Sequence, residues 1–190
     1  MLIASYKSFQ LDKINPIIFI TPVIALILVI LMFIYLCRKV DNKGVFKRFS
    51  FIVLVLAFVL NFVWELGQMP LYKEASYNLQ HIAFCALASF ADAIMVFLIY
   101  FSFALIYKKP LWIQELTAGR FSILVFVGCL GAILAEMRHV SVGNWAYNKY
   151  MPIIPIVDVG FSPVFQFMML PICIYYFSFK ITKTCMKQNF

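Results

Sequence analysis

Residues 14–37 read INPIIFITPVIALILVILMFIYLC, an apolar stretch that contains no Asp, Glu, Lys or Arg. A helix of about 20 such residues is long enough to cross the hydrocarbon core of a bilayer. The stretch is continuous and is preceded by polar residues, so we interpret it as a membrane-spanning helix rather than a cleaved signal peptide. This segment predicts that the chain folds in lipid.

The composition of the whole chain supports the same interpretation. Of the 190 residues, 64% are hydrophobic and only 13% are charged. Soluble domains are roughly half apolar and about a quarter charged. A compact soluble domain of this length could not bury so many aromatic and aliphatic side chains. The composition therefore excludes a disordered chain, a secreted disulfide scaffold and a cytosolic zinc module.

Four further apolar stretches follow the first. The predicted spans cover residues 14–37, 49–69, 81–107, 121–137 and 156–179. The connections between them are too short to fold alone, and the chain shows no internal repeat. We therefore predict an all-α, polytopic membrane protein in which residues 1–190 form a single transmembrane domain, a bundle of five transmembrane helices.

The formal net charge of +8 arises from 16 Lys and Arg against 8 Asp and Glu. The basic residues do not combine with aromatic ones on a soluble face, so we expect no nucleic-acid partner. Most of them instead follow the first, third and fifth spans: Arg38, Lys39, Lys43, Lys47, Arg48, Lys108, Lys109, Arg120, Lys180, Lys183 and Lys187. Cytoplasmic connections carry the excess of Lys and Arg. We therefore predict a multi-pass protein of the plasma (inner) membrane, with its N-terminus outside and its C-terminus in the cytoplasm.

Polar side chains recur at helical spacing in four of the five spans. The sets that share a helix face are Asn61, Glu65, Gln68 and Tyr72; His81, Cys85, Ser89 and Asp92; Glu136 and His139; and Asp158, Ser162 and Gln166. Helices rise by about 1.5 Å per residue. At that rise, and with the predicted orientation, all four sets lie in the half of the bilayer nearer the outer surface.

Glu65 and Asp92 are the strongest candidate catalytic residues, because each lies inside a span with no Lys or Arg nearby in its own helix. Ionisable residues within a membrane usually face a protein interior or a watery cavity and often serve function. Carboxyl groups that share an apolar chamber can divide the chemistry, since one can donate a proton while another stays ionised. Glu136 and Asp158 are the candidate partner bases.

A second group of side chains is expected to orient these acids and to line the chamber. The candidate substrate-binding residues are Asn61, Trp64, Gln68, Tyr72, His81, Trp145, Tyr147 and Gln166. Two of them lie in the connection formed by residues 138–155, where Pro152 and Pro155 prevent a helix from running through. The aromatic rings offer apolar surface, and their faces can stabilise a cation.

Each of these residues also has a purely structural interpretation. A lone Asn, Gln or Ser in a span often serves only helix–helix contact, and His81, Glu136 and Asp158 can simply lie at the headgroup level. The same residue types would also serve a small proton-coupled transporter or permease. Polar stripes that face outward would instead suit a non-catalytic subunit of a membrane complex.

Two segments resemble known enzyme families. Asn61-Phe62-Val63-Trp64-Glu65 resembles the N-x-x-W-E motif of fungal integral-membrane terpene cyclases, in which the Glu takes part in protonating the substrate, and Asp92 matches a second membrane Asp of those enzymes. Glu136, followed by Gly143-Asn144-Trp145-Ala146-Tyr147 and by Pro152 and Pro155, is similar to segments of the lycopene-cyclase and carotenoid-hydratase membrane families. The terpene cyclases have seven spans against five here, and the acidic pair of lycopene cyclases is reduced to Asp158.

These resemblances imply a cofactor-independent enzyme that acts on an isoprenoid or another apolar lipid by protonation and deprotonation, as a cyclase, isomerase or hydratase. They imply no metal and no redox cofactor, and they leave membrane lipids and a second copy of the chain as the expected partners. The motifs W-E-x-x-Q-x-P-L-Y, A-S-x-x-D and M-P-x-x-P with S-P-x-x-Q also resemble small bacterial multi-pass membrane proteins, which implies no activity. The chain contains no HExxH, phosphate-loop or Ser-His-Asp pattern.

Overall fold

The computed structural model describes residues 20–73 and 75–187, with side chains up to residue 185. Its five long helices are α1 (Ile20–Lys39), α2 (Lys43–Gln68), α3 (Leu79–Ile106), α4 (Ala118–Ser141) and α5 (Phe161–Lys187). All five are long and apolar enough to cross a membrane. The prediction of an all-α fold with five helices long and apolar enough to span a membrane is therefore confirmed for the described residues. Residues 14–19, the predicted start of the first span, lie outside the described residues.

Three of the helices begin directly after a polar residue that caps them. The side chains of Asn42, Asn78 and Thr117 each accept a hydrogen bond from a backbone N–H in the first turn of α2, α3 and α4. Such caps satisfy an N–H group that has no partner within the helix. These caps explain why α2 and α4 begin several residues before the apolar stretches from which the two helices were predicted.

The predicted start of the fifth span is wrong. Residues 153–160 form a two-stranded hairpin in which β1 (Ile153–Ile154) pairs antiparallel with β2 (Val159–Gly160). Asp158 lies in the turn between these strands with a φ of 52°, in the left-handed region that Asp tolerates better than most residues. The helix therefore starts at Phe161, after the hairpin, and Asp158 does not belong to it.

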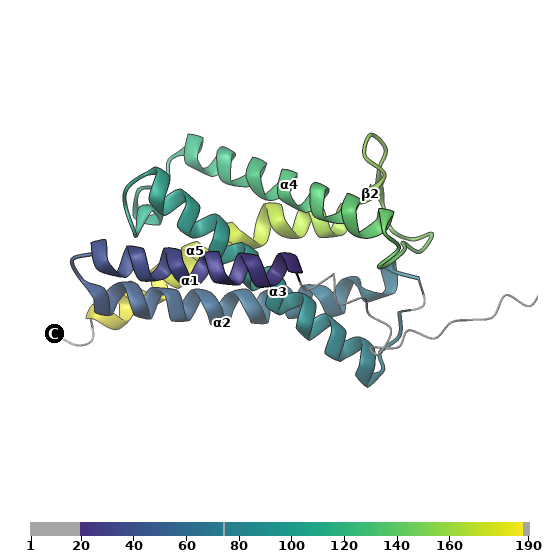
Figure 1. Ribbon diagram of the computed structural model, residues 1–190, viewed down its shortest axis with the longest axis horizontal. Helices are drawn as coiled ribbons and strands as arrows, with labels where there is room; N and C mark the ends of the chain where they lie inside the picture. The colour runs from purple at the N-terminus through teal and green to yellow at the C-terminus, as the bar shows by residue number, and fades with distance from the viewer. Residues whose placement is uncertain (1–19, 74, 188–190) are drawn as a thin grey trace, which may run out of the picture.

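The helices run roughly along the length of the bundle (Figure 1), and their contacts give the packing order α1, α3, α2, α5 and α4. Helix α2 lies at the centre, between α3 and α5, while α1 packs mainly on α3 and α4 packs on α5. Pro171 interrupts the hydrogen-bond ladder of α5 near its middle. This order places the polar faces of α2, α3 and α5 next to one another.

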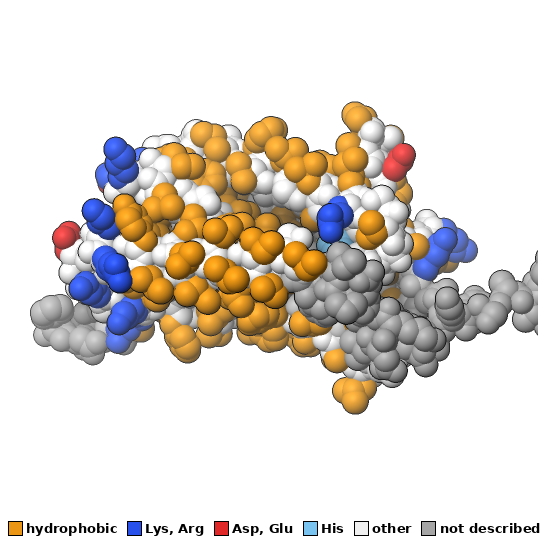
Figure 2. Space-filling view, in the orientation of Figure 1, with side chains coloured by type: hydrophobic (Ala, Val, Ile, Leu, Met, Phe, Trp, Pro, Cys, Tyr) orange, Lys and Arg blue, Asp and Glu red, His pale blue; other side chains and the backbone are white. Residues whose placement is uncertain are grey.

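The surface of the bundle divides into a long apolar belt and two ends. Figure 2 shows hydrophobic side chains along the helices and Lys and Arg side chains gathered where α1 meets α2. We call that end the basic end. The opposite end, which carries the hairpin and the connection between α2 and α3, is called the loop end.

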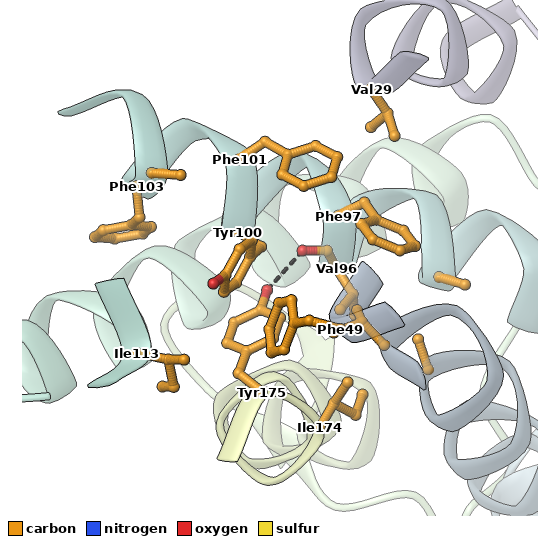
Figure 3. Close-up of a cluster of buried hydrophobic side chains, with 14 of the residues drawn as sticks. Val29, Phe49, Val96, Phe97, Tyr100, Phe101, Phe103, Ile113, Ile174 and Tyr175 are labelled. Carbon is orange, nitrogen blue, oxygen red and sulfur yellow. Dashed lines mark hydrogen bonds between the residues drawn. The ribbon is translucent and has the colours of Figure 1, made fainter. Parts of the chain in front are cut away.

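Buried aromatic side chains form the core of the half nearer the basic end (Figure 3). The centroid of the Tyr100 ring lies 4.9 Å from that of Tyr175 and 5.4 Å from that of Trp112. The polar tips of these rings are satisfied by the backbone, since the Tyr175 hydroxyl donates to the Val96 carbonyl at 2.6 Å and Trp112 Nε1 donates to the Tyr100 carbonyl at 3.1 Å. This half of the bundle is closely packed.

The contact between α4 and α5 depends on Gly128, because a Cβ atom there would lie 2.2 Å from the backbone oxygen of Phe167. Gly128→Ala should therefore push the two helices apart and cost about 1–3 kcal/mol of stability. Thermal unfolding in detergent, followed by size-exclusion chromatography, measures the loss. Gly131→Ala on the same helix is the control, because a Cβ at that position meets nothing within 4 Å. Equal stability of the two variants would contradict this packing.

Candidate active site

The polar face of α2 supplies the first part of the candidate site. Asn61 and Gln68 are buried and Glu65 is half-buried on this face. Pro70 then ends the α-helix, because it has no N–H group to continue the ladder, and Met69–Leu71 form a short 3-10 turn, η3. The backbone becomes extended at Tyr72, which carries its ring past the end of the helix.

Three side-chain amides, those of Asn61, Gln68 and Gln166, connect α2, α3 and α5. We call them the amide array. Gln166 Nε2 donates to Asn61 Oδ1 at 2.8 Å and to Asp92 Oδ2 at 3.1 Å. Gln68 Nε2 donates to Glu65 Oε1 at 2.8 Å and to Gln166 Oε1 at 3.3 Å. The two acids predicted to act together are therefore joined through two glutamines from different helices.

Neighbouring groups fix the direction of each amide. The Ser162 hydroxyl donates to Gln68 Oε1 at 2.8 Å, and Asn61 Nδ2 donates to the Ala57 carbonyl at 2.7 Å. Both N–H groups of Gln68 and both of Gln166 are thus used, and their oxygens act only as acceptors. Each acid consequently receives an N–H donor on one of its two oxygens.

Glu136 on α4 binds the loop that follows the helix. It is buried, and its Oε2 accepts hydrogen bonds from Trp145 Nε1 at 3.2 Å and from the Tyr147 hydroxyl. Burial, and then the hydrogen bond to Glu136, raise the pKa of Tyr147, so its hydroxyl stays protonated and remains a donor at neutral pH. His139 stacks on the Trp145 ring with centroids 4.3 Å apart.

The same loop pairs with the end of α2. The Lys73 N–H donates to the Ala146 carbonyl and the Asn148 N–H donates to the Leu71 carbonyl, both at 2.8 Å. These bonds flank an isolated antiparallel bridge between Tyr72 and Tyr147, whose ring centroids lie 5.7 Å apart. The loop therefore covers the site at the loop end.

Each of the three acids has one oxygen atom that no described residue satisfies. Within the described residues, Glu65 Oε2, Asp92 Oδ1 and Glu136 Oε1 accept no hydrogen bond. The three carboxyl groups also interact electrostatically with one another. We call the part of the bundle that holds these three carboxyl groups the acid chamber.

Tyr72 packs against the aromatic side chains of the loop that binds Glu136. Its hydroxyl group makes no hydrogen bond to any described residue, although the Tyr72 ring contacts the rings of Trp145 and Tyr147. Burial, and then the negative charges of Glu136 and Glu65, raise the pKa of Tyr72 well above its usual value. The hydroxyl therefore keeps its proton and can donate it in a hydrogen bond.

Three predicted site residues lie outside this network. Asp158 is exposed on the hairpin turn, so its predicted place beside Ser162 and Gln166 is wrong. His81 lies in the first turn of α3, with Nδ1 3.0 Å from Asn78 Oδ1. Trp64 packs on Phe165 with ring centroids 6.0 Å apart, and its Nε1 is enclosed without a hydrogen-bond partner.

Two residues contribute that were not assigned a role from the sequence. Ser162 orients Gln68, and His139 supports the Trp145 ring. Both lie on the predicted polar faces, so spacing alone could have indicated them. Within the described part of the chain, no three His, Cys, Asp or Glu side chains are grouped as a metal ion would require.

Comparison with known proteins finds no matching family model, curated protein or solved structure.

Gln166→Leu should destabilise the protein, because it removes the donors to Asn61 and Asp92 and leaves buried acceptors unpaired. Each unpaired group costs about 1–3 kcal/mol. Thermal unfolding in detergent measures the loss, and Gln114→Leu at an exposed position of the connection between α3 and α4 is the control. A Gln166→Leu protein as stable as this control would show that the amide array does not hold the helices together.

Proposed function

We propose that this protein is an integral-membrane enzyme that acts on an isoprenoid or another apolar lipid by acid–base chemistry. The observation that carries the proposal is the pair Glu65 and Asp92. They come from different helices, are oriented by one amide array, and each has one carboxylate oxygen that accepts no hydrogen bond from a described residue. An acid and a base held at fixed positions in apolar surroundings are what such chemistry requires.

The proposed reaction begins with protonation of a carbon–carbon double bond. One carboxyl group of the pair carries the proton, since two carboxylates close together in an apolar site repel each other. Its proton and the π electrons of the substrate form a new C–H bond and leave a carbocation. A carboxylate of the chamber then removes a proton from the neighbouring carbon, which forms a new double bond. The net result is an isomerisation. A cyclisation would follow if the π electrons of a second double bond in the substrate first formed a C–C bond to the cation, and a hydration would follow if water added to the cation and then lost a proton to the carboxylate.

An apolar substrate would enter from the side of the bundle. The loop that binds Glu136 and pairs with the end of η3 covers the loop end. The half of the bundle nearer the basic end is closely packed. Between α4 and α1, however, the surface is hollowed (Figure 2), in keeping with the packing of α4 on α5 and of α1 on α3.

The excess of Lys and Arg at the basic end supports an orientation in which that end is cytoplasmic. We therefore propose that the N-terminus lies outside, the C-terminus lies in the cytoplasm, and the chamber opens toward the outer leaflet of the plasma membrane.

A transporter would need a path through the other half of the bundle, and the fully buried side chains of Tyr100, Trp112 and Tyr175 fill that half. A structural subunit would direct its polar side chains toward a partner, whereas these polar side chains bind one another. Both observations favour the enzyme over the two alternatives.

The proposal predicts that Glu65→Gln and Asp92→Asn each lower turnover by about 100-fold or more, the usual contribution of a general acid or base. The purified protein, with its co-extracted lipid, is incubated in D₂O with squalene, a carotenoid or a polyprenol. Mass spectrometry should detect product in which deuterium is bound to carbon. Asp41→Asn, an exposed acid at the basic end, is the matched control and should leave turnover unchanged. Turnover that survives both site substitutions would contradict the proposal.

A further inference from the structure

The connection between α1 and α2 concentrates positive charge at the basic end. Residues 38–48 contain five basic residues and a single acid, Asp41. Only residues 40–42 separate the two helices, so the charges lie close together where Figure 2 shows Lys and Arg side chains gathered. We call this surface the basic patch. Its basic side chains, all of them exposed, are Arg38, Lys39, Lys43, Lys47 and Arg48.

The connection between α3 and α4 carries a second basic cluster, which the protein partly neutralises. Glu115 binds Lys109 at 2.6 Å and Arg120 at 3.6 Å. Arg120 also donates to the Glu115 carbonyl at 2.8 Å and lies over the Tyr107 ring. This cluster has three basic residues against one acid, and two of the three are bound to that acid. The basic patch, with five against one, therefore offers more positive charge to an anionic ligand.

Exposed apolar side chains continue the basic patch toward the middle of the bundle. Ile34 lies four residues before Arg38 on α1, and Phe51 lies four residues after Lys47 on α2. Their exposed fractions are 43% and 65%. Residues four apart on a helix are neighbours on one face and lie about 6 Å apart along its axis. A base at the end of each helix is thus followed by apolar surface one turn deeper.

This combination fits a phospholipid better than a soluble anion. The phosphate of a headgroup accepts strong hydrogen bonds from Lys and Arg side chains, and bases next to a membrane span attract anionic lipids. The acyl chains of the same molecule cover apolar surface below the headgroup. Free phosphate would use the bases alone and leave Ile34 and Phe51 without a partner.

We propose that the basic patch binds the headgroup of an anionic phospholipid, whose acyl chains lie along the exposed apolar side chains of α1 and α2. The patch is at the opposite end of the bundle from Glu65 and Asp92. The proposal is therefore independent of the proposed acid–base chemistry, and its test needs no turnover.

The test compares two lipids with the same acyl chains. Palmitoyl-oleoyl phosphatidylglycerol is anionic, whereas palmitoyl-oleoyl phosphatidylcholine carries no net charge. Native mass spectrometry of the full chain in detergent micelles counts the lipid bound at each lipid concentration. Phosphatidylglycerol should bind at least about tenfold more tightly, because each base near the headgroup contributes about fivefold. Equal affinity for the two lipids would overturn the proposal.

Substitutions then locate the site. The double variant Lys43→Gln and Lys47→Gln should lower the affinity for phosphatidylglycerol about tenfold or more and leave that for phosphatidylcholine unchanged. The double variant Lys108→Gln and Lys109→Gln removes the same charge from the connection between α3 and α4. This matched control should change either affinity by less than about twofold. Equal losses in the two double variants would overturn the proposal, because the lipid would then respond to the charge of the whole end.

Lysine reactivity in the wild-type protein keeps the test decisive if a variant does not fold. A water-soluble N-hydroxysuccinimide ester of acetic acid modifies exposed amines, and mass spectrometry of peptides follows the rate at each lysine. Phosphatidylglycerol should slow modification of Lys43 and Lys47 but not of Lys108, and phosphatidylcholine should slow none of them. Inorganic phosphate at the same concentration should protect none, because it makes no apolar contacts. Equal protection by inorganic phosphate, or equal protection of Lys108 by phosphatidylglycerol, would overturn the proposal.

Discussion

Inside a bilayer no water is available to satisfy a side-chain amide, and this constraint explains the position of Gln166. Its two N–H groups reach Asn61 on α2 and Asp92 on α3, while its oxygen receives an N–H from Gln68. Polar groups in lipid must find partners within the protein. Any slip of α5 along α2 would leave several of these groups unpaired at once. The amide array therefore sets how the three central helices align, and the acids are held in place by the same bonds.

The two halves of the bundle have different roles because they are built from different side chains. Near the basic end, rings such as Tyr100, Trp112 and Tyr175 fill the interior and bind their polar tips to the backbone. Near the loop end the interior contains carboxyl groups that keep free oxygens. Glu136 closes this half toward the loop by binding Trp145 and Tyr147.

Much of this arrangement could be predicted from the sequence, because helical spacing determines which side chains share a face. The spacing of Asn61, Glu65 and Gln68 predicted one stripe on α2, and Asp92 was expected to lie opposite it. Asp158 could not be placed correctly, since a two-stranded hairpin replaces the first predicted turn of α5. Whether the short apolar segment around Pro155 forms a helix or a hairpin depends on what it packs against. The spacing of its residues does not reveal those contacts.

The role of Glu136 shows a second limit of the sequence. Its depth and charge suggested a catalytic base, and nothing in its spacing showed that it would bind the loop that follows α4. That contact depends on the path of residues 142–149 back to η3. Gly128 is a similar case, since its close approach to α5 arises from the crossing of two helices. Features that depend on one element can be predicted from periodicity, whereas contacts between elements require the folded chain.

The central claim is that Glu65 and Asp92 share one chamber, and labelling with dicyclohexylcarbodiimide tests it most directly. This apolar reagent forms stable adducts with carboxyl groups in apolar surroundings, and intact-mass spectrometry counts the adducts per chain. A shared chamber predicts a single adduct in the wild-type protein, divided between Glu65 and Asp92, because the first adduct fills the space that a second would need. Molecules that carry adducts on both residues would show that the two acids lie in separate surroundings, and the account would be wrong.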